Sequence, residues 1–265
     1  GNGIGRIISM FSFVTKLYCN YRRYLRNFKP DIVIASSTYP LDIYPAYRIA
    51  RHYHAKLIYE VHDLWPLSPM ELGGYSKKHP FIRIMQKAED DCYRYADAVV
   101  SMLPKAEEHM REHGLTRDKF HYVPNGIVLS DWNNPKGIPE EHGLLLSKLR
   151  AEGKFIVGFA GAHGIANSLY AVIDAVSSLT EQNVVLVLVG GGQEKENLIK
   201  YAHKKGVTNV YFLLPINKLA IPNLLKEMDV LYIGLQKQSL FRFGISPNKV
   251  FDYMMAAKPI IQAID

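Results

Sequence analysis

Apolar residues near the start of the chain recur at three- and four-residue steps, from Ile7 to Leu25, with arginine and lysine between them. This period is that of an amphipathic helix, and it predicts a helix over Ile4–Phe28 that ends before Pro30. Such a helix either packs its apolar face on a core or lies on an anionic membrane surface. The pattern favours core packing, and both contacts are compatible if they use different faces.

Short β-rich runs then alternate with helical stretches in two series. The predicted strands are residues 31–35, 56–60, 98–101 and 120–123, followed by 155–159, 184–189, 209–212, 230–233 and 259–261. The predicted helices are residues 40–53, 81–95, 104–113, 168–179, 194–205, 218–226 and 247–257. Continuous Val/Ile/Leu strands such as Val184–Val189 are typical of a parallel sheet covered on both faces. The strict alternation predicts an α/β fold of doubly wound, Rossmann-like type.

A stretch rich in turn residues separates the two series, between residues 124 and 154. It contains Asn125-Gly126 and further Asn, Gly and Pro residues, which are typical of turns and linkers. We therefore predict two Rossmann-like domains, residues 1–130 and 131–265. Ligands of such domains bind at the carboxyl ends of the strands.

Composition narrows the class of protein. With 48% hydrophobic and 22% charged residues in 265, the chain is neither disordered nor fibrous. The net charge of +7 favours phosphates, nucleic acid or an acidic membrane as partners. No nucleic-acid-binding module is recognisable, so nucleic acid is not expected. Two cysteines are too few for a disulfide framework, which indicates a reducing compartment, and no apolar run reaches membrane-spanning length.

The most informative segment runs from Ser246 to Asp252. Ser246 is predicted to cap a helix and Pro247 to occupy its first position, so Asn248 and Lys249 follow in the first turn. Free backbone N–H groups and the helix dipole make such a start an anion site, and Lys249 adds charge. Asp252, on the second turn, could accept two hydrogen bonds from a ribose diol. The alternative is an ordinary capped helix with a solvated lysine and aspartate.

A second segment runs from a predicted strand into a Gly-rich turn, Gly161-Ala-His-Gly164. Small residues allow backbone N–H groups to close on a phosphate, and His163 and Asn167 could add donors. The alternative is an ordinary strand-to-helix turn. A similar run at Gly190–Gly192 lacks the third glycine and the acidic residue of a dinucleotide fingerprint, which disfavours a nicotinamide enzyme.

His62 and Asp63 follow another predicted strand, at the sheet edge that α/β sites use. His62 could donate to a sugar hydroxyl or to a departing phosphate, although a lone histidine is more often structural. The acidic run Glu89–Asp91 is interpreted as a solvated helix face. No cluster of histidine and cysteine with zinc spacing is recognised, so no metal site is predicted.

These segments resemble bacterial family 4 glycosyltransferases of the GT-B fold, along essentially the whole chain. Among them, the chain is most similar to the group assigned as L-fucosamine transferases of O-antigen and capsule synthesis. The motifs that carry the resemblance are Lys-Pro-Asp-Ile-Val at 29–33, Glu-Val-His-Asp-Leu-Trp-Pro at 60–66, Val-Pro-Asn-Gly at 123–126, Gly-Phe-Ala-Gly-Ala-His-Gly at 158–164, Leu-Val-Gly-Gly-Gly at 188–192, and Ser-Pro-Asn-Lys at 246–249 with Asp-Tyr-Met at 252–254 and Ala-Ala-Lys-Pro at 256–259.

The resemblance implies a nucleotide-sugar donor, expected to be UDP-linked, whose diphosphate is held by the Gly161–Gly164 turn and the Ser246–Lys249 helix start. Asp252 matches the second acidic position of the family's Glu-x7-Glu motif, which binds ribose, whereas Gly244 stands at the first. The implied roles of the other positions are as follows: Asn167 replaces the usual phosphate-binding lysine, Leu214 and Pro215 line the base pocket, and His62 reaches the donor sugar.

The implied activity is transfer of the sugar to a glycan or lipid-linked acceptor in cell-surface polysaccharide synthesis. The enzyme is expected to retain the anomeric configuration of the sugar and to need no cofactor or metal. It is expected to act in the cytoplasm and at the inner face of the plasma membrane. Family members carry further β-α units before Ile4 and further chain after Asp265, so both domains are expected to be incomplete. Two alternatives stay open: a GT-B sugar-nucleotide epimerase, and a non-catalytic module that binds sugar nucleotides or membranes.

Overall fold

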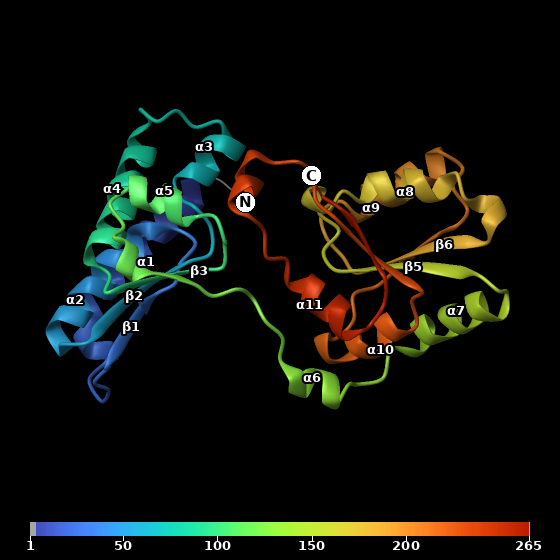
Figure 1. Cartoon of the computed structure of the whole chain (residues 1–265), viewed down its shortest axis with the longest axis horizontal. Coiled ribbons are helices and arrows are strands. Elements are labelled where there is room, and N and C mark those ends of the chain that lie inside the picture. The colour runs from blue at the N-terminus through green and yellow to red at the C-terminus, as the bar shows by residue number, and fades with distance from the viewer. Residues whose placement is uncertain (1–3, 265) are drawn as a thin grey trace. The chain divides into compact units, whose positions relative to one another are not determined.

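The computed structural model describes residues 4–264, whose contacts divide the chain into two compact units (Figure 1). The first unit comprises the chain up to Asn125 together with Gln238–Ser246. The second comprises Gly126–Lys237 and the chain from Pro247 onward. The division therefore falls five residues before the predicted boundary at 130. Furthermore, the first unit contains a segment from the far end of the chain that the sequence did not predict to belong there.

The first unit is built on a parallel sheet in the order β1-β2-β3-β4. Its strands are β1 (Ile32–Ala35), β2 (Lys56–Val61), β3 (Ala98–Ser101) and β4 (Phe120–Tyr122). Its helices are α1 (Ile4–Tyr24), α2 (Ile43–Tyr53), α3 (Leu67–Gly73), α4 (Pro80–Tyr95) and α5 (Glu107–Glu112). Short 3-10 turns lie at η1 (Pro40–Asp42) and η2 (Arg117–Lys119).

One face of this sheet carries the core of the first unit. Leu57 and Val99 point to that face and pack with Ala46 of α2 and Cys92 of α4. The alternate residues point the other way, and Ile32 is 56% exposed. This alternation follows from the two-residue period of a strand, because only one side of each strand meets the helices.

Helix α1 packs against α2 and ends at Tyr24, four residues before the predicted end. Met10 and Tyr21 are buried, which confirms the core-facing interpretation of its apolar stripe. Ile8 and Phe13 of the same helix are exposed. Among residues 4–264, no helix is both long enough and apolar enough to cross a membrane.

The second unit has a five-stranded parallel sheet in the order β7-β6-β5-β8-β9. Its strands are β5 (Phe155–Ala160), β6 (Val184–Val189), β7 (Val210–Leu213), β8 (Val230–Gly234) and β9 (Ile260–Ala263). From β5 the chain winds outward to β7 on one side, and then returns to β8 on the other. This reversal of winding confirms the doubly wound prediction and puts the topological switch point between β5 and β8.

Helices cover both faces of this second sheet (Figure 1). The helices are α6 (Leu129–Asn133), α7 (Glu140–Ala151), α8 (Leu169–Ser177), α9 (Lys195–Lys204), α10 (Ile221–Lys226) and α11 (Asn248–Met255), with 3-10 turns η3 (Ile165–Asn167), η4 (Thr180–Gln182) and η5 (Lys218–Ala220). One apolar cluster joins the sheet to α8 and α9. The other joins the opposite face to α7, α10 and α11. The continuous apolar strands are explained by this two-sided burial.

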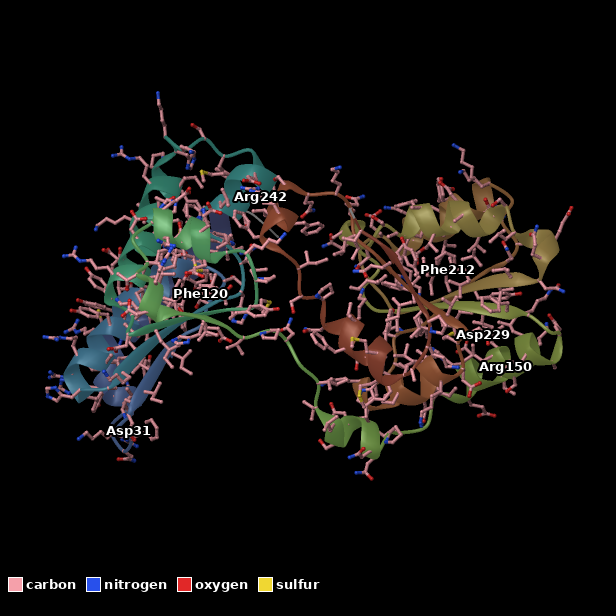
Figure 2. All side chains as sticks on the ribbon, in the orientation of Figure 1. Asp31, Phe120, Arg150, Phe212, Asp229 and Arg242 are labelled. Atoms are coloured by element: carbon pink, nitrogen blue, oxygen red, sulfur yellow. The ribbon has the colours of Figure 1, made fainter. Side chains whose placement is uncertain are left out.

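Helix α7 lies in the stretch that the sequence predicted to be a linker, so that prediction was wrong for residues 140–151. The Asn134-Pro135 and Gly137-Ile138-Pro139 turn residues precede α7, whereas Leu146 and Leu149 of the helix are buried in the core. Figure 2 shows Arg150, near the end of α7, beside Asp229, which precedes β8; their Nη1 and Oδ1 atoms are 3.6 Å apart. Helix α7 is therefore an integral layer of the second unit.

The segment Gln238–Ser246 contains a 3-10 turn, η6 (Ser239–Phe243), and packs on the first unit. The Arg242 guanidinium contacts both carboxylate oxygens of Glu71, at 2.6 and 2.9 Å. This pairing lowers the pKa of Glu71 to about 2. The Phe243 carbonyl accepts a hydrogen bond from the Lys105 N–H at 3.0 Å, and the Phe243 ring packs on the core. We call residues 238–246 the strap.

Candidate active site

The Gly-rich turn after β5 lies at the switch point of the second sheet, beside the loop after β6. The His163 N–H donates to the Gly191 carbonyl at 2.8 Å, which ties the two loops together. Gly190 has φ of 147°, and a Cβ there would collide with the Gly161 carbonyl oxygen. Lys195 donates to the Gly190 carbonyl at 2.9 Å. Close backbone approach thus requires the glycines, and Lys195 places a positive charge beside them.

Lys249 of α11 reaches this turn. Its Nζ donates to the Oδ1 of Asn167 at 2.9 Å and lies 4.2 Å from the centroid of the Phe159 ring. It is also 3.2 Å from the position that a Cβ on Gly161 would take. The Asn167 amide is oriented by its own donation to the Ala162 carbonyl at 2.9 Å. Burial lowers the pKa of Lys249 to about 8, so the ammonium is only weakly favoured without a further negative partner.

His163 is fully buried inside the turn, between the rings of Phe159 and Phe212. Neither of its ring nitrogens has a hydrogen-bond partner within the described part of the chain. Burial, with smaller contributions from Lys195 and Lys249, lowers its pKa to about 4. The ring is therefore neutral at pH 7 and has unmet hydrogen-bonding capacity, next to the lysine that the sequence predicted to bind phosphate.

Leu214 and Pro215 follow β7 at the same sheet edge. The Pro215 Cγ lies 3.9 Å from the position that a Cβ on Gly191 would take. The Leu214 side chain is exposed, and its carbonyl accepts from the Nε2 of buried His142 at 2.9 Å. His142 belongs to α7, so the missed helix supports the loop predicted to line a base pocket. The carboxyl edge of the second sheet thus brings together the Gly161–Gly164 turn, Asn167, Leu214, Pro215 and Lys249.

The start of α11 differs from the prediction. The helix begins at Asn248, Pro247 occupies the N-cap position, and no side chain caps the helix. Ser246 is instead turned toward Asn125, whose side-chain amide donates to the Ser246 carbonyl at 2.6 Å and whose N–H reaches its hydroxyl at 3.4 Å. The predicted Ser246 cap was therefore wrong, because its hydroxyl is oriented within the first unit rather than toward the helix.

Asp252 lies on the same helix as Lys249 but has different neighbours. Its Oδ1 accepts from the indole N–H of Trp132 at 3.2 Å. Burial raises the pKa of Asp252. With Trp132, Asn248 and Lys218 it lines a cavity of about 210 Å³. The sequence did not single out Trp132 or Lys218, since nothing local in α6 or η5 links them to α11. The predicted ribose role of Asp252 stays a prediction.

In the first unit, His62 belongs to a polar cluster at the carboxyl edge of the sheet. The Ser36 hydroxyl donates to the Glu60 Oε2 at 2.6 Å. The same hydroxyl oxygen lies 2.9 Å from the His62 Nε2 and accepts from it, because its own hydrogen is already used. The Nε2 and the Glu60 carboxylate are 3.5 Å apart. His62 is thus held in one orientation by Ser36 and Glu60, which the sequence did not associate with it.

Gly244, at the first acidic position of the Glu-x7-Glu spacing, lies in the strap. Its φ is 94°, which favours glycine. A Cβ there would lie 2.6 Å from the Cγ and Cδ of Pro104. A glutamate could not occupy this backbone without displacing the strap, so the departure from the family pattern has a local physical reason.

The acidic run on α4 is the solvated face that the sequence predicted only at Asp90, whose side chain is 50% exposed. Glu89 is 1% exposed and Asp91 5% exposed. The Tyr93 hydroxyl donates to Glu89 at 2.9 Å, and the Tyr44 hydroxyl donates to Asp91 at 3.0 Å. The sequence prediction assumed that these carboxylates face solvent because they are charged. In the structure, Glu89 and Asp91 are packed against partners, of which Tyr44 is distant in sequence.

Each unit matches a known domain family. Residues 6–126 match the family described as Glycosyl transferase 4-like domain. Residues 146–262 match the family described as Glycosyl transferases group 1. The first match ends next to Asn125, where the first unit gives way to the second, and the second match includes the strap. The two matches thus follow the two sheets.

Individual relatives are distant in sequence. A protein of Bacillus subtilis (strain 168) named as a teichuronic acid biosynthesis glycosyltransferase, TuaH, is 24% identical over 215 residues, covering 78% of this chain and 50% of TuaH. The crystal structure of Anabaena Alr3699/HepE in complex with UDP is similar with a TM-score of 0.68 at 18% identity, covering 92% of this chain and 62% of that chain. The crystal structure of WaaG, a glycosyltransferase involved in lipopolysaccharide biosynthesis, is similar with a TM-score of 0.58 at 16% identity. The match covers 89% of this chain and 67% of WaaG. The chain thus spans about half the length of TuaH.

Proposed function

We propose that this chain, which belongs to the GT-B glycosyltransferases through its 4-like and group 1 domains, transfers a sugar from a nucleotide-sugar donor to an acceptor. The observation that carries the proposal is the convergence of Lys249 and Asn167 on the Gly161 turn. This edge is the switch point of the second sheet, where α/β folds bind their ligands.

The proposed role of this edge is to hold the donor diphosphate. The backbone N–H groups at the start of α11 and the Lys249 ammonium supply positive charge without a metal ion. The negative charge on the diphosphate grows as the bond to the sugar breaks. In such reactions, charged and polar groups that are already in position around the developing charge give the largest electrostatic stabilisation of the transition state. His62, oriented by Ser36, is proposed to reach the donor sugar. Retention of configuration is part of the same proposal.

The donor is proposed to be a UDP-sugar. The supporting observation is that the fold is shared with HepE, which has been crystallised with UDP and with UDP-glucose. The acceptor is proposed to be a glycan or lipid-linked saccharide of the cell surface. TuaH, named for teichuronic acid synthesis, and WaaG, named for lipopolysaccharide synthesis, support this class. An amino sugar of the L-fucosamine type is the specific donor that the sequence resemblance favours.

One observation favours a second candidate function, a non-catalytic module that binds sugar nucleotides. Gly244 leaves the first acidic position without a side chain, and the strap geometry admits none. Such a module would bind UDP-sugars but would never release UDP from them. Measurement of UDP release in the presence of acceptor glycans separates the two functions.

We also propose that α1 contacts the inner face of the plasma membrane. Ile8 and Phe13 are exposed on a helix that carries Arg6, Lys16, Arg22 and Arg23. Co-sedimentation with anionic vesicles is expected for the intact chain and is expected to fall in an Ile8→Ser/Phe13→Ser variant. A Leu144→Ser variant, which removes an exposed leucine from α7, serves as the control. Equal sedimentation of all three proteins contradicts the membrane contact.

A thermal-shift panel of UDP-, GDP- and dTDP-sugars tests the donor assignment. A ligand that binds only the folded chain raises its melting temperature. UDP-sugars are expected to raise it most. A chain that none of the three nucleotide classes stabilises would rule out the proposed donor site.

A further inference from the structure

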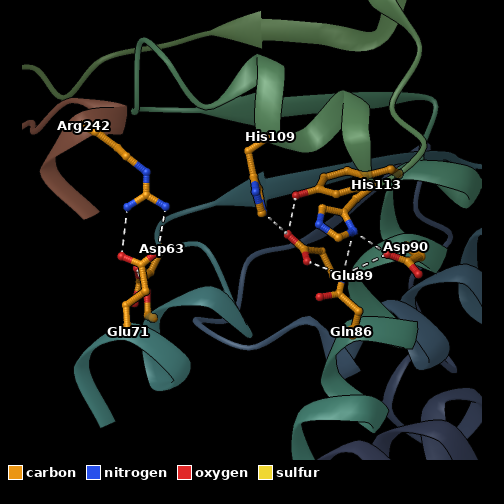
Figure 3. A network of polar contacts seen from close by, with 10 residues as sticks. Asp63, Glu71, Gln86, Glu89, Asp90, His109, His113 and Arg242 are labelled. Atoms are coloured by element: carbon orange, nitrogen blue, oxygen red, sulfur yellow. Dashed lines mark hydrogen bonds and ion pairs between the residues drawn. The ribbon is translucent and has the colours of Figure 1, made fainter. Parts of the chain in front are cut away.

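Two histidines and a buried carboxylate meet between α4 and α5 of the first unit, in a cluster that the proposed transfer reaction does not use. Glu89 comes from α4, His109 from α5, and His113 directly follows α5 (Figure 3). His109 and His113 are four residues apart and therefore share one side of the helix. This is also a spacing found among zinc ligands, which the prediction of no metal site overlooked.

The potential ligand atoms of the cluster are close together. One atom from each of Glu89, His109 and His113 lies within 4.8 Å of the others. The His109 Nε2 is 3.2 Å from the Glu89 Oε1. The His113 Nδ1 is 3.1 Å from the Asp90 Oδ1. Zinc bonds to nitrogen and carboxylate oxygen are about 2.0–2.2 Å long, so a small adjustment of the three side chains lets one ion bond to an atom from each of them.

Hydrogen bonding alone leaves the cluster unsatisfied. The Gln86 Nε2 faces three acceptor atoms: the Glu89 Oε2 at 2.8 Å, the Asp90 Oδ1 at 2.9 Å and the His113 Nδ1 at 2.8 Å. An amide nitrogen has only two hydrogens. If the amide were flipped, its oxygen would face two carboxylates, so that acceptors would face acceptors and no hydrogen bond would form with either.

The same conflict appears at His113. If its Nδ1 carries a hydrogen, the ring can donate to Asp90 but then faces the hydrogens of the Gln86 amide. If its Nδ1 is bare, it can accept from Gln86 but then faces the Asp90 carboxylate, acceptor to acceptor. Neither protonation state of His113 satisfies both contacts of its Nδ1, and a cation bound at that nitrogen would also offset the charge of the buried Glu89 carboxylate.

We propose that Glu89, His109 and His113 bind a divalent transition-metal ion of the zinc type. Two imidazoles with a carboxylate suit zinc rather than magnesium or calcium, which prefer all-oxygen sites. The Tyr93 hydroxyl donates to the Glu89 Oε1 at 2.9 Å and orients that carboxylate, as outer partners of metal ligands do.

The bound ion would hold α5 against α4. It would also stabilise the position of the strap, because α5 contacts the strap through His109. The His109 ring lies edge-on to the Phe243 ring of the strap, with centroids 5.5 Å apart. The proposed role of the ion is therefore structural, and the transfer reaction proposed at Lys249 does not use it. Its presence is expected to raise the melting temperature of the chain.

Titration of the untagged chain with ZnCl2 in a non-chelating buffer tests the proposal. One tight equivalent of Zn²⁺ is expected to bind, and Mg²⁺ is not expected to compete. A His109→Gln/His113→Gln variant is expected to lose that equivalent. A His121→Gln variant, which removes an exposed histidine from β4, is expected to keep it. Circular dichroism of each variant without metal checks that the fold is retained.

Cobalt substitution of the unmodified chain is the second measurement, and it does not depend on any variant folding. A single visible d–d band that saturates at one equivalent of Co²⁺ and is displaced by Zn²⁺ supports a site with few, fixed ligands. The proposal is overturned if no such band forms. It is also overturned if the double-histidine variant folds and binds Zn²⁺ as the His121→Gln control does.

Discussion

The Nζ of Lys249 donates a hydrogen bond of 2.9 Å to the Oδ1 of Asn167, across 82 residues of sequence. Asn167 provides the uncharged oxygen that the partly buried ammonium requires before any ligand arrives. A diphosphate would provide a stronger, charged acceptor at the same ammonium. The pair therefore links the Gly-rich turn to α11 and sets the charge of the edge proposed to bind the donor.

An Asn167→Asp substitution is expected to weaken UDP binding at least tenfold. The new carboxylate would pair with Lys249 and repel the diphosphate, and a tenfold loss corresponds to about 1.4 kcal/mol. Isothermal titration of UDP measures the effect. An Asn20→Asp variant adds the same charge on α1 of the first unit and is expected to bind UDP like the parent chain. Similar affinities for all three proteins would mean that the anion binds elsewhere.

The affinity for UDP is expected to fall as the pH rises above about 8. Burial lowers the pKa of Lys249 to about 8. Above that pH the free site loses its ammonium, and binding must then supply the energy to protonate it. The loss approaches tenfold per pH unit. A Lys249→Met variant is expected to bind weakly at every pH, and a pH-independent affinity in the parent chain contradicts the assignment.

A His163→Leu substitution is expected to protect the chain against acid. The pKa of His163 is lowered from its ordinary 6.5 to about 4. Between these values the unfolded chain binds a proton that the folded chain does not, so the free energy of unfolding of the parent decreases as the pH falls from 6.5 to 4. The variant lacks this group and is expected to lose less stability over that range in urea titrations. Parallel losses in both proteins would show that His163 is not the titrating group.

A Gly244→Glu substitution restores the family's acidic position in sequence but is expected to destabilise the strap. With φ of 94° and Pro104 at 2.6 Å from the new Cβ, the side chain must shift the backbone. The cost is of order 1–3 kcal/mol, measured as the free energy of unfolding. Gly137→Ala is the control, because nothing lies within 4 Å of its Cβ position. A stable Gly244→Glu chain with increased activity would mean that the strap adapts.

The strand pattern of the fold could be predicted because the strands are long apolar runs with turn residues at their ends. Residues 184–189 and 98–101 were predicted with the bounds that the structure has. Helix α7 could not be recognised, because its apolar stripe is short and follows a run of prolines and glycines. The strap was not predicted either, since its place depends on the Glu71–Arg242 pair, which no local pattern reveals.

The candidate site was predicted in part for a similar reason. The turn after β5 and Lys249 lie at the carboxyl edge of parallel strands, and fold topology alone brings them to one edge. The Trp132 partner of Asp252 and the Ser36 partner of His62 come from other elements, at distances in sequence that motifs do not encode. The missed Ser246 contact shows the same limit, because Asn125 competes for a residue that looks like a helix cap.

The central claim is that the Gly161 turn and Lys249 hold a nucleotide diphosphate. Isothermal titration of UDP and of uridine into the parent chain, Lys249→Met and Lys200→Met tests it most directly. Lys200 is an exposed lysine of α9 and serves as the matched control. We predict that the parent and Lys200→Met bind UDP more than tenfold more tightly than uridine, and that Lys249→Met loses most of that difference. An undiminished preference for UDP in Lys249→Met would contradict the account.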